Sequence, residues 1–152
     1  MSCGLALALA LVAGDASTTA AAAVPVAAAP AALAQEPLYA EIVQRAKGLH
    51  LRVKTAETAG AADVAVLKRE VDALAALDMQ GHFDLKARNV DGDLKCILKG
   101  IAEDLPKRLD DLAAARDADT RVSALKEMSY LLNDNVEVVV AGPGPATPPP
   151  AS

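Results

Sequence analysis

The stretch that decides the fold is RVSALKEMSYLLNDNVEVVV, residues 121–140. Five apolar residues and one serine recur in it at intervals of three or four: Val122, Leu125, Ser129, Leu132, Val136 and Val139. Because an α-helix has about 3.6 residues per turn, this spacing draws one stripe along one face of a helix. The pattern therefore predicts an amphipathic helix that buries its stripe against other helices.

Three earlier segments show the same spacing. Their stripes are Leu38, Ile42, Ala46, Leu49, Val53 and Ala56; Val64, Leu67, Val71, Leu74 and Leu77; and Leu94, Ile97, Ile101, Leu105, Leu109 and Leu112. Four such helices joined by short connections favour antiparallel neighbours. The sequence thus predicts an all-α protein, an up-down-up-down four-helix bundle over residues 35–141.

Helix-breaking and helix-starting residues fit this arrangement. Pro37 suits the first position of the first helix, where a missing N–H has no cost. Gly60 and Gly81 are placed to end the first and second helices in left-handed turns. Asp91 and Asp93 are candidate caps for the third helix.

Two further expectations concern the third and fourth helices. Pro106 falls inside the third helix and removes a backbone hydrogen bond, so we expect a kink near Ala102 or a break near Leu105. The cap of the fourth helix is expected among Asp117, Asp119 and Thr120, because short oxygen-bearing side chains accept hydrogen bonds from free amides.

Both ends of the chain differ from its middle. Residues 1–34 contain two apolar runs, Leu5–Ala13 and Ala20–Ala34, and the second ends in an A-x-A pattern before Gln35. Such a pattern is typical of a signal peptide, although the basic region that usually comes first is missing. A transit peptide or an alanine-rich disordered leader would look similar. Residues 142–152 are proline-rich, and we expect a disordered tail.

Composition excludes several classes of protein. The only aromatic residues are Tyr39, Phe83 and Tyr130, which disfavours a β-sandwich or barrel. The net charge of −5 disfavours a nucleic-acid partner. Neither apolar run of the leader reaches the ~18 residues of a spanning helix, so we expect no integral membrane span after processing. The two cysteines, Cys3 and Cys96, form no CxxC motif, which excludes a cysteine-only zinc site.

His50 and Met128 are candidate ligands for a cofactor. Each lies at the edge of its stripe, and both fall at similar heights if the first and fourth helices are antiparallel neighbours. A histidine and a methionine that face each other across a bundle resemble the haem ligands of b-type cytochromes of the four-helix class. The alternative is a boundary histidine and a gap-filling core methionine.

A second resemblance also involves His50. The stretch His50-Leu51-Arg52-Val53-Lys54, with Gly60-Ala61 beyond it, resembles the motif of His-phosphotransfer domains, which are four-helix bundles as well. Gly60-Ala61 fits that motif, whereas the residues directly after the histidine depart from it. The resemblance implies a phosphoryl-accepting role for His50.

Cys96 is the remaining candidate. It lies about 160° around the third helix from the stripe, so we expect an exposed thiol. If the leader is removed, Cys96 is the only cysteine left, and a lone exposed cysteine in an exported protein suggests an intermolecular disulfide or a reactive thiol. An inert, half-covered thiol is the alternative.

These observations predict an exported, non-enzymatic protein, periplasmic or secreted, that acts as an interaction or structural component. The contact would be made through a helix face or Cys96, with a protein partner or in a homodimer. A haem or small-molecule binder using His50 and Met128 is the alternative. We expect no catalytic residue, no metal and no resident cofactor, since Ser123 and Ser129 have no nearby histidine base and no metal-binding motif is present.

Export can be tested by the intact mass of protein isolated from its native host. Because the A-x-A pattern ends at Ala34, we expect a mature chain that starts near Gln35. A full-length product retained in the cytoplasm would contradict the prediction.

Overall fold

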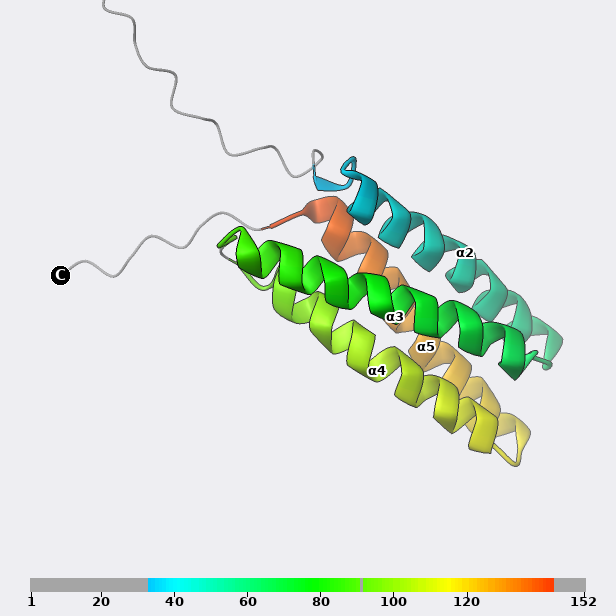
Figure 1. The fold of residues 1–152 in the computed structure, drawn as a ribbon. Helices are drawn as coiled ribbons and strands as arrows, with labels where there is room; N and C mark the ends of the chain where they lie inside the picture. The colour runs from blue at the N-terminus through cyan, green and yellow to red at the C-terminus, as the bar shows by residue number, and fades with distance from the viewer. Residues whose placement is uncertain (1–32, 91, 144–152) are drawn as a thin grey trace, which may run out of the picture.

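The structure, a computed structural model, describes residues 33–90 and 92–143. Within this part of the chain it contains four helices and no strand (Figure 1). They are α2 (Pro37–Ala59), α3 (Val64–Ala87), α4 (Leu94–Ala114) and α5 (Ala118–Ala141). The all-α prediction is confirmed. The predicted leader, apart from its last two residues, and most of the predicted tail lie outside the described residues.

The four helices pack lengthwise around a shared interior. Each helix contacts the next one in the chain, and α5 also contacts α2. Figure 1 shows the helices side by side with their long axes roughly aligned. Apolar side chains from all four helices form one buried cluster, which includes Ile42, Leu74, Leu98, Leu105, Leu125 and Leu132. None of the helices in the described residues is long and apolar enough to cross a bilayer.

Several predicted helix ends are confirmed. Pro37 is the first residue of α2, and Gly60 ends that helix with a left-handed φ of 67°. Asp117 caps α5, because its side chain accepts a hydrogen bond of 2.8 Å from the backbone N–H of Thr120. Asp93 is the N-cap residue of α4, as predicted, but its side chain makes no capping hydrogen bond. Asp91 lies outside the described residues.

The prediction that Gly81 ends the second helix is wrong. The helix α3 continues to Ala87, and Gly81 lies inside it, facing the core. A Cβ atom at this position would lie 3.0 Å from Leu98 Cδ1, 3.3 Å from Ile42 Cδ1 and 3.4 Å from Tyr39 Cε1. Gly81 therefore allows close packing against α2 and α4, and the turn is made later, where Asn89 has a φ of 51°.

The third helix also differs from one expectation. The helix α4 runs unbroken through Pro106, so the predicted break near Leu105 is wrong. Proline inside a helix costs roughly 3 kcal/mol. Leu105 and Leu109, on either side of it, are buried and hold the helix against the core. The kink near Ala102 stays a prediction.

The predicted stripes are correct in period but shifted in places. In α4 Leu98 is fully buried, whereas the neighbouring residue Ile97, which the stripe predicted, is only half-buried. In α2 Tyr39 is fully buried, whereas the predicted Leu38 is half-buried. In α5 Met128 and Asn135 are fully buried in place of Ser129 and Val136. In these three helices the buried face is therefore turned slightly from the face that the predicted stripe indicates.

Tyr39 also fixes the start of α2 against the end of α3. Its hydroxyl donates a hydrogen bond of 2.7 Å to Asp84 Oδ2. Burial first, and then this bond to the Asp84 carboxylate, raises the pKa of Tyr39. Arg88 forms ion pairs with Asp84 and with Glu36, the residue before α2. The two helix ends are thus connected by a polar network at the edge of the core.

Candidate functional site: the groove between α2 and α5

A shallow groove runs along the contact between α2 and α5. It has a volume of about 350 Å³. Its lining residues are His50, Lys54 and Glu57 from α2 and Lys126, Ser129, Tyr130 and Asn133 from α5. We refer to it as the α2–α5 groove. It contains His50, one of the candidates that the sequence singled out.

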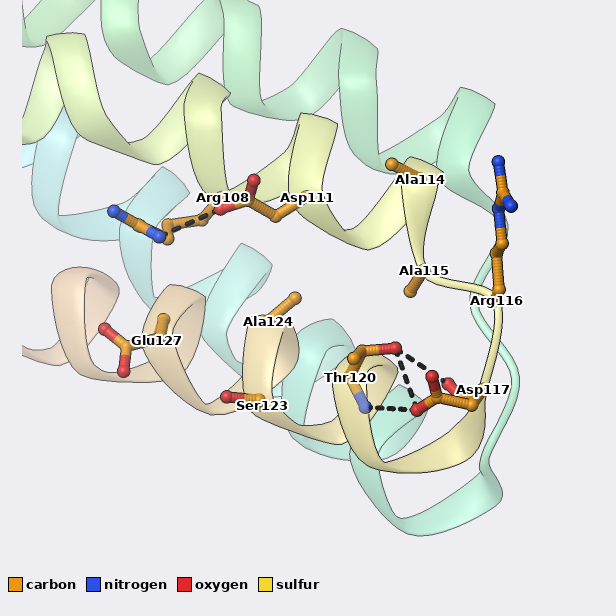
Figure 2. Close-up of a pocket in the computed structure, with 10 residues that line it drawn as sticks. All are labelled: Arg108, Asp111, Ala114, Ala115, Arg116, Asp117, Thr120, Ser123, Ala124 and Glu127. Carbon is orange, nitrogen blue, oxygen red and sulfur yellow. Dashed lines mark hydrogen bonds and ion pairs between the residues drawn. The ribbon is translucent and has the colours of Figure 1, made fainter.

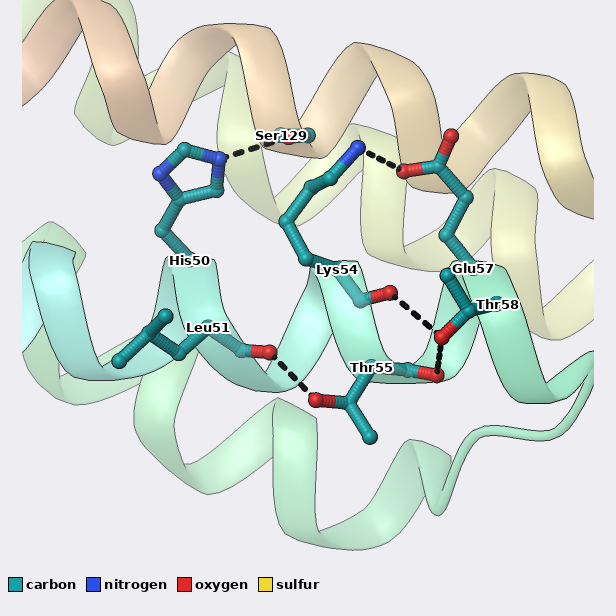
Figure 3. A network of polar contacts seen from close by, with 7 residues as sticks. All are labelled: His50, Leu51, Lys54, Thr55, Glu57, Thr58 and Ser129. Carbon is teal, nitrogen blue, oxygen red and sulfur yellow. Dashed lines mark hydrogen bonds and ion pairs between the residues drawn. The ribbon is translucent and has the colours of Figure 1, made fainter.

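His50 connects the two walls of the groove. Its Nε2 atom lies 2.8 Å from the hydroxyl oxygen of Ser129. Figure 3 shows the ring turned toward Ser129 across the two helices. The side chain is half-buried, and the hydrogen bond ties α2 to α5 in the middle of the groove. Ser129, which the sequence placed in the apolar stripe, is therefore a polar residue at the stripe's margin.

Met128 lies on the other side of the α5 backbone from the groove surface. Its side chain is fully buried in the core. The structure thus brings His50 and Met128 onto neighbouring helices, but places them in different surroundings. The hydrogen bond of His50 and the packing of Met128 each provide a structural role, and the haem and phosphotransfer hypotheses stay predictions.

Glu57 is surrounded by basic groups. The ammonium group of Lys54 lies 2.7 Å from Glu57 Oε2, one helical turn away on α2 (Figure 3). This hydrogen bond is the main cause of the lowered pKa of Glu57; partial desolvation raises it, and the charges of Lys54, Lys126 and His50 lower it further. Glu57 is the only acidic residue that lines the groove.

The groove is consequently basic on an acidic protein. Lys47 lies three residues before His50, so helical spacing places it on the same face of α2. Lys47 and Lys126 form no ion pair with another described residue, whereas Lys54 is paired with Glu57. The chain as a whole carries a net charge of −5. The unpaired lysines favour an anionic group at this face.

One large exposed apolar side chain, Tyr130, lines the groove, and another, Leu51, lies on α2 and lines a separate hollow toward α3. Leu51 and Tyr130 are each 70% exposed, and they directly follow His50 and Ser129 in the sequence. A single exposed apolar residue is common in folded proteins, but a pair on neighbouring helices is less so. Sequence reasoning missed both. Their signal was present, since at 100° per residue Leu51 lies about 175° and Tyr130 about 130° from the centre of the predicted stripe of its own helix.

A second hollow lies at the turn between α4 and α5, and Figure 2 shows it. Its volume is about 470 Å³. Its polar groups are largely engaged with one another. Arg108 pairs with Asp111 at 2.8 Å, and Asp117 bonds Thr120 to cap α5. The hydrogen bond from the Thr120 amide is the main cause of the lowered pKa of Asp117. We interpret these contacts as helix-end stabilisation.

Metal binding has no support in the described residues. No group of three or more histidine, cysteine, aspartate or glutamate side chains within them could hold a metal ion. Cys96 stands alone on the surface of α4 as an exposed free thiol, in agreement with the expected orientation. Its role as a disulfide or reactive thiol stays a prediction.

Comparison with known proteins adds no assignment. No protein-family model matches the chain, and no significant match is found among curated proteins or among solved structures.

The exposure of Cys96 predicts a reactive thiol in the native protein. We expect a thiol reagent to label native protein at nearly the rate seen after unfolding, because no core packing shields the sulfur. In a glutathione disulfide buffer we expect a mixed disulfide or a disulfide-linked dimer on non-reducing gels, which Cys96→Ser abolishes. Labelling that occurs only after unfolding would show that the thiol is buried.

Proposed function

We propose that this chain is an exported, non-enzymatic interaction protein that binds an acidic protein segment through the α2–α5 groove. The helices would form an up-down-up-down bundle that serves as a rigid support for this face. The observation that carries the proposal is the exposed apolar side chain of Tyr130 in a basic groove, with a second exposed apolar side chain, Leu51, next to His50 on α2.

The short connections support the bundle order. Only residues 60–63 separate α2 from α3, and only residues 115–117 separate α4 from α5. Connections this short bring consecutive helices back alongside each other in opposite directions. Contact between α2 and α5 then closes the ring of four helices. In this order the two walls of the groove belong to α2 and α5, which contact each other but are not consecutive in the chain.

The charges of the groove favour an acidic partner. Lys47 and Lys126 have no partner among the described acidic residues, and Glu57 is already neutralised by Lys54. Carboxylates of a bound segment would approach these lysines, while its apolar side chains would cover Leu51 and Tyr130. Exposed aromatic residues are frequent anchors at protein interfaces, and charge complementarity contributes mainly to specificity and association rate.

Export rests on the N-terminal sequence alone. The apolar runs Leu5–Ala13 and Ala20–Ala34 support it, and a periplasmic or external location follows from it. Cys96 offers a second candidate contact, through a disulfide with a partner or a second copy. Its support is the exposure of the thiol.

Binding can be tested with two synthetic amphipathic helical peptides of identical leucine pattern, one carrying glutamates and one carrying lysines. We expect the acidic peptide to shift the backbone amide NMR signals around Leu51 and Tyr130. A Leu51→Ser, Tyr130→Ser double variant should weaken binding at least tenfold, a loss of about 1.4 kcal/mol. Lys47→Glu with Lys126→Glu should weaken it too and remove its salt dependence.

The matched controls lie on other helices. Phe83→Ser removes another exposed apolar side chain, on α3, and Lys99→Glu reverses a lysine on α4. Both controls should bind the acidic peptide as the wild type does. Equal binding of the two peptides, or equal losses in the groove and control variants, would refute the proposed face.

A further inference from the structure

The interior contains one polar pair that the sequence analysis did not identify. Asp78 of α3 and Asn135 of α5 are both completely buried. The side-chain amide of Asn135 donates a hydrogen bond of 2.7 Å to Asp78 Oδ2. These are the only polar residues among the buried side chains of the described chain. They join α3 and α5, two helices that otherwise share little contact.

The remaining oxygens of this pair lack partners. Neither Asp78 Oδ1 nor Asn135 Oδ1 has a hydrogen-bond partner among the described residues. An ionised carboxylate can only accept hydrogen bonds, so it cannot satisfy the carbonyl oxygen of Asn135. A buried polar atom without a partner costs about 1–3 kcal/mol, and an unpaired buried charge costs more. The ionised pair is therefore short of one donor.

One proton supplies that donor. A protonated carboxyl group has one O–H donor and one carbonyl acceptor, as a carboxamide has an N–H donor and a carbonyl acceptor. Asp78 could then donate from Oδ1 to Asn135 Oδ1 while it still accepts from Asn135 at Oδ2. Both oxygens that now lack partners would be satisfied by the same proton.

The surroundings of Asp78 contain no compensating cation. Burial raises the pKa of Asp78 from its usual 3.8 to about 7, and only the hydrogen bond from Asn135 opposes this shift. No neighbouring charge is among the causes of this shift, and titratable side chains on the packed helices are engaged with other partners. Tyr39 of α2 bonds Asp84, His82 of α3 lies 2.6 Å from the carbonyl oxygen of Lys95, and Lys95 of α4 bonds Val90. On α5 Asp134, beside Asn135, adds a negative charge near that helix rather than a positive one.

We propose that Asp78 is protonated in the folded protein below neutral pH and forms a reciprocal hydrogen-bonded pair with Asn135, so that the contact between α3 and α5 is a pH-sensitive latch. The proton comes from solvent, and an O–H bond forms at Asp78 Oδ1. When the pH rises, this bond breaks, its electron pair stays on the carboxylate, and the proton returns to solvent. The ionised carboxylate of Asp78 is then a buried charge that accepts a single hydrogen bond, from Asn135, and the folded state is less stable.

The direction of the effect follows from proton linkage. Between pH 3.8 and about 7 the folded state keeps a proton that the unfolded chain has lost. Stability from this group is therefore complete below about pH 4 and decreases as the pH rises through 7. Within that window the equilibrium constant for unfolding should rise about tenfold per pH unit on account of Asp78 alone.

The test compares urea unfolding of the full chain at several pH values between 5 and 8. Asp78→Asn keeps the reciprocal pair in a form that cannot ionise, so the ratio of its unfolding constant to that of the wild type should change about tenfold per pH unit below 7. Asp72→Asn is the matched control, because Asp72 is an exposed carboxylate on the same helix, paired with Lys68. It should retain the wild-type dependence on pH. Groups common to the compared chains cancel in these ratios.

A second measurement does not require a folded variant. The side-chain carboxyl carbon of Asp78 can be followed by NMR in the wild-type protein as the pH is raised. We expect its signal to shift with a midpoint well above that of exposed aspartates such as Asp72. A midpoint below pH 5, or identical pH dependence in the wild type and Asp78→Asn, would show that the buried carboxyl is ionised and overturn the proposal.

Discussion

The burial of one apolar stripe from each of four helices is the constraint on which the rest of this structure depends. Each stripe leaves the opposite face of its helix polar, so no helix can be stable alone in water and all four must meet. Because all four stripes share one interior, the helices must approach one another closely. Gly81 gives the side chains of Ile42 and Leu98 room to reach α3. The polar network of Tyr39, Asp84 and Arg88 lies at the edge of the same interior.

The helix α5 carries both of the features from which function is inferred. Ser129 and Tyr130 lie on its outer side and line the groove with α2. Asn135, one and a half turns further along, lies in the interior and bonds Asp78. On the outer face of α5 the apolar side chain of Tyr130 lies exposed near the unpaired Lys126. On the inner face Asn135 makes a polar contact within an otherwise apolar core. Both depart from the simple rule of apolar inside and polar outside, and such departures are common at functional positions.

Sequence periodicity predicted the helices well because the spacing of Leu, Ile and Val is directly tied to the helical turn. It identified Leu105, Leu125 and Leu132 as core residues, and these are buried. It failed at Gly81, because glycine ends helices and also permits close helix packing, and the sequence does not distinguish the two uses. It assigned Ile97 in place of Leu98, because a step of three and a step of four fit the same stripe.

The candidate site was less predictable than the fold. His50 was recognised as an edge residue, but its partner Ser129 was taken for part of the stripe. The pair of Asp78 and Asn135 was missed, because the predicted stripes pass through the apolar residues Leu77 and Val136, each next to one member of the pair. The two residues are 57 positions apart in the chain and lie on different helices. Their contact depends on tertiary packing, so no local sequence pattern predicts it. The exposure of Cys96 was predictable, since it needed only the phase of one helix.

Native-state hydrogen exchange tests the central claim, the common burial of the four stripes, most directly. Amide protection depends on stable helical hydrogen bonds held in place by packing. We predict that the amides of Gly81, His82 and Leu85 in α3 exchange as slowly as those of Val71 and Leu74, because one packed helix contains them all. Exchange of residues 81–87 at the rate of an unstructured peptide would contradict the account, since α3 would then end before its contacts with α2 and α4.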